Sequence, residues 1–137
     1  MNRSVLYLSV MTAHPHYPEI RDSRMRLPDG LDVNYHDNQA SVSQAALSYG
    51  FDTRFSNGLT STSRANLLGG FDTQFSDGVY SVSKTNLSGG LDTRYSDGSV
   101  SMSRRNLAGG FDIQYNDGRF RTCQLNLSEG MTFYPRA

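Results

Sequence analysis

The sequence predicts an all-β fold: an antiparallel meander of five 20-residue β-hairpin repeats, closed or curled into a barrel of about 10–12 strands. Three observations predict it. A repeat runs five times from Leu31 to Gly130 without insertion or deletion. Four of the five copies carry Asn-Gly or Asp-Gly at the same point, a strong hairpin signal. Apolar and polar residues alternate on both sides of that dipeptide, as they do along amphipathic strands.

The positions that do not vary show what each copy requires. In all five copies the second position is Asp, the fifth is aromatic, the seventeenth is Leu and the twentieth is Gly; in the first copy these are Asp32, Tyr35, Leu47 and Gly50. Repeats of this length are supersecondary units that stack to bury a shared core. We interpret each copy as two strands and two turns, with the Gly at position twenty at the second reversal.

Before the repeats, Ser4 to Met11 alternates without charge and predicts a first strand. The same segment faintly resembles a signal peptide, but it is short and interrupted by serines, so we favour the strand. His14 to Gly30 is the only segment that does not follow the repeat, and we interpret it as a Pro-bounded connector. His14 and His16 have the spacing of a metal-binding pair on a strand, yet no third ligand accompanies them, so we expect no metal site.

Within a repeat, we interpret the Asp77-Gly78 dipeptide as a two-residue type I′ turn. Phe75 then faces Tyr80 across the hairpin, and alternation sorts the side chains into two faces. The apolar face would carry Phe71, Thr73, Phe75, Tyr80 and Val82 in this copy, Val100 and Met102 in the next, and Phe111, Ile113, Tyr115 and Phe120 in the last. The polar face would carry the Asp of position two and the serines of positions eleven and thirteen.

A parallel β-solenoid with one repeat per coil is the main structural alternative. Its equivalent Asp residues would stack about 4.8 Å apart as a ladder of like charges. In a meander they are two strands apart, roughly 9.5 Å. Charge and turn chemistry therefore both favour the meander.

After the repeats, Met131 and Phe133 continue the apolar alternation as a final half repeat. Residues 1–137 thus form one domain: an N-terminal strand and connector at 1–30, repeats at 31–130, and a terminal half repeat at 131–137. An aromatic face cannot remain in water, and closure removes the exposed edges of the sheet. An open sheet that pairs with a second chain, forming a homo-oligomer, is the alternative.

Composition narrows the possible functions. The formal net charge is zero and the charges are spread along the chain, so there is no basic surface for nucleic acid. The apolar runs are too short for a transmembrane helix. The single cysteine, Cys123, occupies a position that is Ser in the other copies and excludes an internal disulfide. The chain has no motif of a catalytic nucleophile, phosphate loop or zinc protease, so we expect neither an enzyme nor a bound cofactor.

One repeated polar pattern is a candidate ligand site. Position two is an acceptor, position four is a planar donor and position five is a ring; copied several times, this set is typical of a multivalent glycan-binding surface. The candidate residues are Asp52, Arg54, Asp72, Gln74, Asp92, Arg94, Asp112 and Gln114. Alternation places each Asp and its ring on opposite faces. The structural explanation, that each Asp pairs with Arg or Ser on a neighbouring strand, is therefore favoured.

The turn sequences Phe75-Ser76-Asp77-Gly78 and Tyr95-Ser96-Asp97-Gly98 resemble the core of MORN-type repeats. This resemblance extends over Leu31 to Tyr134, and it implies a β-hairpin array in an interaction protein. MORN units are slightly longer and carry a Gly-x-Gly step that is missing here. The likeness therefore assigns no binding residues.

Together these observations predict a non-enzymatic repeat β-module that acts as a binding or scaffold protein, with a protein or a glycan as its partner. One alternative is a multivalent carbohydrate-binding protein. Another is a barrel that holds a small apolar ligand among its aromatic residues: Phe51, Phe55, Phe71, Phe75, Tyr80, Tyr95 and Phe120.

Overall fold

The computed structural model describes residues 20–26, 30–46, 50–125 and 131–135. Within these ranges the chain forms twelve β-strands and one 3₁₀ turn, η1 (His36–Asn38). The strands are β1 (Ile20–Arg26), β2 (Gly30–Tyr35), β3 (Ala40–Ala46), β4 (Gly50–Phe55), β5 (Thr60–Ala65), β6 (Phe71–Phe75), β7 (Tyr80–Thr85), β8 (Gly89–Tyr95), β9 (Val100–Arg105), β10 (Phe111–Tyr115), β11 (Phe120–Leu125) and β12 (Met131–Pro135).

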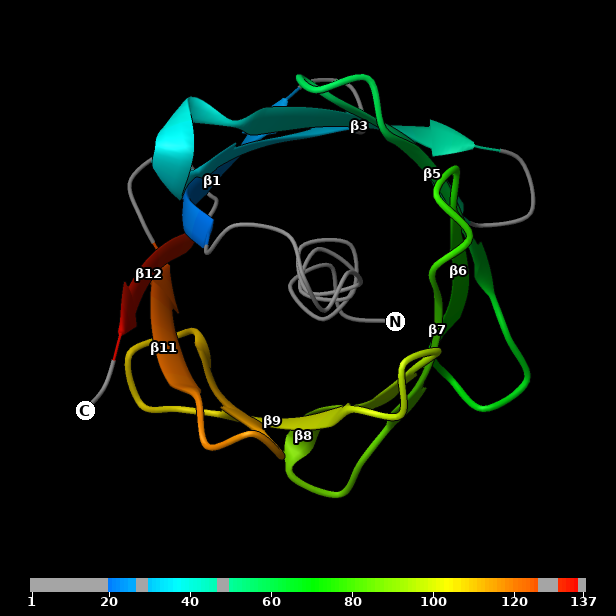
Figure 1. Cartoon of the computed structure of the whole chain (residues 1–137). Coiled ribbons are helices and arrows are strands. Elements are labelled where there is room, and N and C mark those ends of the chain that lie inside the picture. The colour runs from blue at the N-terminus through cyan, green and yellow to red at the C-terminus, as the bar shows by residue number, and fades with distance from the viewer. Residues whose placement is uncertain (1–19, 27–29, 47–49, 126–130, 136–137) are drawn as a thin grey trace.

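The strands form a single closed barrel (Figure 1). Each strand pairs antiparallel with its predecessor, and β1 also pairs with β12, where Asp22 lies opposite Thr132. The predicted all-β meander and its closure are therefore confirmed, and the antiparallel pairing excludes the parallel solenoid. No strand in the described part of the barrel has a free edge, so it offers no template for edge-to-edge pairing.

The predicted hairpin register is wrong by one residue, because the turn has three residues rather than two. The Gly78 N–H donates to the Phe75 carbonyl (3.0 Å), and the Phe75 N–H donates to the Val79 carbonyl (2.9 Å). Gly78 has φ +91°. This is a type I turn followed by a left-handed glycine, the three-residue hairpin loop. Gln74, and not Phe75, therefore lies opposite Tyr80.

The shift by one residue moves the second strand of each hairpin to the other face. Tyr80, Val82 and Met102, which the two-residue turn placed in the core, point outward with 52%, 37% and 60% of their surface exposed. Val100 is also exposed, and Phe120 lies opposite the exposed Gln114 on the outer wall. The serines of positions eleven and thirteen take their place inside.

The barrel interior therefore combines rings with hydroxyl groups. The first strand of each hairpin contributes the residues predicted for the core, among them Phe71, Phe75, Phe111 and Ile113. The second strand contributes buried serines, and two of them lie within hydrogen-bonding distance of threonines on the adjacent strand. Ser63 Oγ lies 2.8 Å from Thr73 Oγ1, and Ser43 Oγ lies 2.8 Å from Thr53 Oγ1. These contacts matter because a buried hydroxyl without a partner is costly.

The serine of position thirteen also joins the two strands of a hairpin at their base. Ser103 Oγ accepts the Leu91 N–H (2.8 Å) and donates to the Leu91 carbonyl (3.2 Å). Ser83 Oγ makes the same pair of contacts with Phe71, at 2.9 and 3.3 Å. In the last repeat Cys123 Sγ replaces the hydroxyl and accepts the Phe111 N–H at 3.3 Å.

The barrel closes with a further copy of this arrangement. Ser23 Oγ on β1 accepts the Met131 N–H (2.9 Å) and donates to the Met131 carbonyl (3.4 Å), as Ser103 does with Leu91. Counting back one repeat from Leu31 places Ser23 at position thirteen and Gly30 at position twenty. β1 and β12 are thus the two halves of a sixth hairpin, divided between the ends of the repeat array.

This finding corrects the interpretation of His14 to Gly30 as a connector, because residues 20–26 are a strand of the barrel. The expected half repeat at the other end is confirmed: Met131 and Phe133 are buried on β12. The predicted strand Ser4 to Met11 lies outside the described residues, as do His14 and His16.

We predict that Ser23→Ala lowers the free energy of unfolding by about 1–2 kcal/mol, since the Met131 N–H and carbonyl lose their side-chain partner. Ser103→Ala removes the same contacts within a continuous hairpin and is the matched control. Urea denaturation of both variants measures the two losses. A neutral Ser23→Ala beside a destabilising Ser103→Ala would contradict closure through β1 and β12.

A second prediction concerns the buried phenols. Burial raises the pKa of Tyr95, whose hydroxyl lies 3.1 Å from Ser101 Oγ, and burial also raises the pKa of Tyr115. Above about pH 10 the unfolded chain loses these protons while the native barrel keeps them. The contribution of the two tyrosines to the free energy of unfolding is therefore fully present below about pH 10. At higher pH the free energy of unfolding falls by at most about 1.4 kcal/mol per pH unit for each tyrosine.

Thermal unfolding between pH 8 and pH 12 tests this expectation. Tyr95→Phe should unfold at a lower temperature near neutral pH, because a buried hydrogen bond is lost, and should lose less stability above pH 10. Equal alkaline losses in the wild type and the variant would show that Tyr95 is not the group responsible.

Candidate functional site

The two ends of the barrel carry different connections. At one end lie the three-residue turns. At the other lie the longer connections, repeat positions sixteen to twenty, at 66–70, 86–90 (whose two glycines begin β8) and 106–110; they read Asn-Leu-Leu-Gly-Gly, Asn-Leu-Ser-Gly-Gly and Asn-Leu-Ala-Gly-Gly. Figure 1 shows these longer connections flaring outward from the barrel wall. We call the end formed by these three connections the leucine rim.

An asparagine holds each connection in shape. The Asn66 backbone N–H donates to the Gly70 carbonyl at 3.0 Å. The Asn66 side-chain oxygen accepts the N–H groups of Leu68 (2.9 Å) and Gly70 (3.1 Å). The Asn66 side-chain nitrogen donates to Asp72 Oδ1 (3.0 Å) and to the Ser83 carbonyl (2.9 Å). Because one side chain satisfies both the loop and the neighbouring strands, the connection is rigid.

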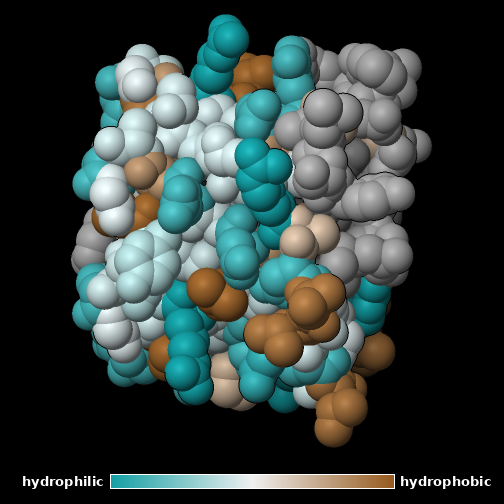
Figure 2. Space-filling view, turned by 90° about the vertical axis from the view of Figure 1, so that its right-hand side faces the viewer, coloured by the Kyte–Doolittle hydropathy of each residue, from teal (hydrophilic) through white to brown (hydrophobic). Residues whose placement is uncertain are grey.

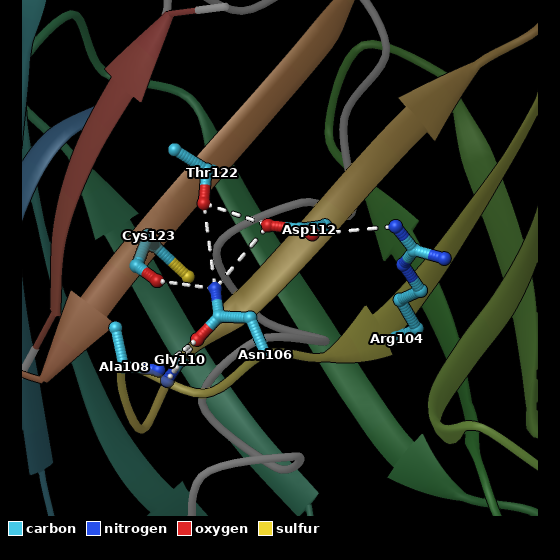
Figure 3. A network of polar contacts seen from close by, with 7 residues as sticks. All are labelled: Arg104, Asn106, Ala108, Gly110, Asp112, Thr122 and Cys123. Atoms are coloured by element: carbon cyan, nitrogen blue, oxygen red, sulfur yellow. Dashed lines mark hydrogen bonds and ion pairs between the residues drawn. The ribbon is translucent and has the colours of Figure 1, made fainter.

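The same arrangement recurs in the next two connections. Figure 3 shows the third, where Asn106 binds the N–H groups of Ala108 and Gly110, the Cys123 carbonyl and the Asp112 carboxylate. Thr122 Oγ1 donates to the same carboxylate oxygen at 2.7 Å, and Arg104 lies 3.7 Å from the other. The position-two Asp is thus a structural partner of the asparagine.

The two glycines of each connection have different roles. Gly109 has φ +81°, so position nineteen supplies the left-handed residue of the reversal. Gly110 lies against the neighbouring strand, where a Cβ atom would meet the Cys123 carbonyl oxygen at 2.0 Å. Position twenty therefore requires Gly because the two backbones approach closely.

The leucine of position seventeen contributes nothing to the core. Leu67, Leu87 and Leu107 are 104%, 108% and 109% exposed, and Leu68 is 58% exposed. Figure 2 shows apolar side chains gathered at the lower right of the visible face, where some protrude beyond the outline of the molecule. The sequence shows the leucine in every copy, but its exposure follows only from its place at the tip of the connection. Leu47 and Leu127 lie outside the described residues.

The opposite rim is polar and acidic. In four of its turns an Asn or Asp Oδ1 accepts the N–H two residues on, as Asp77 does from Val79 at 2.9 Å. In the last turn the Arg119 backbone N–H, together with the Arg119 charge, lowers the pKa of Asp117. The acidic turns at Asp77, Asp97 and Asp117 give this end a chemistry that the leucine rim does not share.

The predicted ligand residues all lie on the outer wall. The pairs Asp52 with Arg54, Asp72 with Gln74, Asp92 with Arg94, and Asp112 with Gln114 stand on β4, β6, β8 and β10, two residues apart on one face. Their position-five rings are inside, so the predicted separation of Asp and ring onto opposite faces is confirmed.

The corrected register gives two of these pairs a different ring. Tyr80 lies opposite Gln74 and Phe120 lies opposite Gln114 on the outer wall. Arg54 and Arg94 lie opposite Thr60 and Val100 instead. The structure therefore brings an acid, an amide and a ring together in two places, and not in every repeat.

The single thiol of the chain is buried. Cys123 faces the barrel interior, and burial raises the pKa of its thiol to about 12, which keeps it protonated and unreactive. Among the described residues, no three His, Cys, Asp or Glu side chains cluster as metal ligands. In the same ranges no helix is long and apolar enough to cross a membrane.

The chain matches no family model, no curated protein and no solved structure. The candidate site is therefore defined by its own geometry: uncharged connections, held by asparagine, that present leucines to solvent.

We predict effects of very different size on stability for two neighbouring residues of this rim. Asn106→Ala should lower the free energy of unfolding by about 2–3 kcal/mol, because several backbone and side-chain partners lose their hydrogen bonds together. Leu107→Ala should change it by less than about 0.5 kcal/mol, because the side chain is fully exposed. Chemical denaturation measures both. A large loss for Leu107→Ala would place this leucine in the core.

Proposed function

We propose that this protein is a non-enzymatic binding module whose contact surface is the leucine rim. One observation carries the proposal: the same residue stands at the tip of three successive connections, fully exposed, on a backbone fixed by hydrogen bonds. Fully exposed single leucines are common, but a repeated set on rigid supports is typical of an interaction surface.

Rigidity supports this proposal energetically. A loop that must become ordered on binding loses conformational entropy, and that loss weakens the complex. Here Asn66, Asn86 and Asn106 hold the loops in one conformation before any partner arrives. Several weak apolar contacts on one body also reinforce each other through effective concentration.

The resemblance to MORN-type repeats agrees with a binding role. The resemblance itself stays a prediction. The alternative of a barrel that encloses a small apolar ligand also stays a prediction, but Tyr80 and Phe120 lie on the outer wall and cannot line its interior.

A glycan-binding wall is the second candidate function. It is favoured by the place where Asp72, Gln74 and Tyr80 share the outer face, since an acceptor, an amide and an exposed ring are the groups that bind sugars. Tyr80 is 52% exposed, and its neighbour Gln74 is also exposed.

The two candidates predict different mutational patterns. We expect wild-type protein immobilised on beads to retain a partner protein from an extract of its source cells. Leu67→Ser/Leu87→Ser/Leu107→Ser should lose that material while its unfolding temperature is unchanged. Gln74→Ala/Tyr80→Ala on the outer wall is the matched control and should retain it. Equal retention by wild type and rim variant would refute the leucine rim as the binding surface.

A thermal-shift screen against sugars at millimolar concentration tests the second candidate directly. A sugar at about 100 times its Kd should stabilise the barrel by roughly 2.7 kcal/mol. Stabilisation that is lost in Gln74→Ala/Tyr80→Ala and kept in the rim variant would make the wall the binding surface. A flat response would leave the rim as the candidate.

A further inference from the structure

We infer that the partner of the leucine rim is a second copy of this chain, and that two barrels associate rim to rim as a closed dimer. The inference rests on the proposed function of the rim as a contact surface. It is carried by three features of the described residues: the regular spacing of the leucines, the absence of charge from the connections between Asn and Gly, and the acidic character of the opposite rim.

Spacing favours a second copy. Leu67, Leu87 and Leu107 occupy one repeat position in successive hairpins, so the tips and the gaps between them recur regularly around the rim. An unrelated partner must have evolved that spacing, whereas a second copy has it by construction. In a two-fold symmetric contact the same patch serves on both sides, and the tips of one rim fit between those of the other.

Charge favours the same partner. The connections 66–70, 86–90 and 106–110 contain no charged side chain, so these three connections can meet their copies without burying like charges against each other. Behind the rim three cations stand directly opposite acids on the neighbouring strands: Arg64 opposite Asp72, Lys84 opposite Asp92 and Arg104 opposite Asp112. Arg105 lies over the ring of Phe111 instead. This balance gives an anionic lipid surface little to attract.

The opposite rim limits assembly to two copies. Its turns carry Asp77 and Asp97, and also Asp117, which is paired with Arg119 at 2.8 Å, so two such ends would bring carboxylates together. A leucine rim placed against an acidic rim would move the charges of Asp77 and Asp97 out of water and against apolar side chains. The contact between the three described connections of two leucine rims carries no such penalty, and it closes on itself, so it does not propagate into a filament.

The apolar area indicates a dimer of moderate strength. A leucine offers on the order of 100 Å² of apolar surface. Three fully exposed leucines and the half-exposed Leu68 then offer roughly 350 Å² per copy, or about 700 Å² in a dimer, against about 1,600 Å² for a standard stable interface. We therefore expect dissociation in the micromolar range or above.

Analytical ultracentrifugation of the purified full chain, from about 1 μM to about 1 mM, tests the inference. The wild type should shift with concentration from the mass of one chain to that of two. Leu67→Ser/Leu87→Ser/Leu107→Ser should stay monomeric throughout, with the circular dichroism and unfolding temperature of the wild type. Val82→Ser/Val100→Ser/Met102→Ser removes apolar side chains from the outer wall and is the matched control, which should still dimerise.

Three results would overturn the inference. One is a wild type that stays monomeric over the whole range. Another is a dimer that the rim variant keeps or the wall control loses. The third is growth beyond two copies. Co-sedimentation of monomeric wild type, but not the rim variant, with phosphatidylcholine vesicles would identify lipid as the occupant instead.

The same measurements separate this inference from the proposed function. If the wild type is monomeric but the beads still retain a different protein that the rim variant loses, the rim is a binding surface and the second copy is not its partner. If the rim variant matches the wild type in every binding measurement, both fail.

Discussion

The conformation of one three-residue turn determines which side chains fill this barrel. The hydrogen bond from the Gly78 N–H to the Phe75 carbonyl, with the left-handed φ of Gly78, places Gln74 opposite Tyr80. Had the turn been one residue shorter, the second strand of each hairpin would face the other way. Equivalent glycines at 58, 98 and 118 have φ between +90° and +94°, so the same constraint fixes four consecutive hairpins. The hydroxyl-rich interior and the exposed apolar residues of the wall both follow from it.

With serine inside, the hairpins that contain Ser83 and Ser103 are held at their base by a hydroxyl that binds the backbone of the neighbouring strand. This contact does not depend on the chain being continuous between the two strands, and that property explains how the barrel closes. Ser23 and Met131 lie at opposite ends of the chain, yet they reproduce the contact of Ser103 with Leu91. A repeat array of five and two halves therefore becomes a ring of six equivalent hairpins, with the terminal strands covering each other's edges.

At the longer connections, the asparagine stabilises the backbone and the leucine beside it is exposed to solvent. The asparagine directs its hydrogen-bonding groups inward to the loop, to the position-two Asp and to the next strand, and this fixes the backbone. The leucine that follows it is fully exposed and does not contribute to the core. Such a separation lets the exposed position change without cost to the fold. The presence of leucine there in all five copies therefore points to a requirement outside the folded chain.

The sequence by itself determined the class of fold, the number and order of the repeated hairpins, and the inward direction of Phe71, Thr73 and Phe75. Those properties depend on local periodicity and on turn residues, which are readable within a few positions. Only the tertiary structure decided the turn length, because Asp-Gly suits both a two-residue and a three-residue loop. It also decided the closing strand at 20–26, whose partner lies 108 positions away from Ser23. The exposure of Leu67, Leu87 and Leu107 was decided there too, because an apolar residue between Asn and Gly shows its environment only when the path of the loop is known.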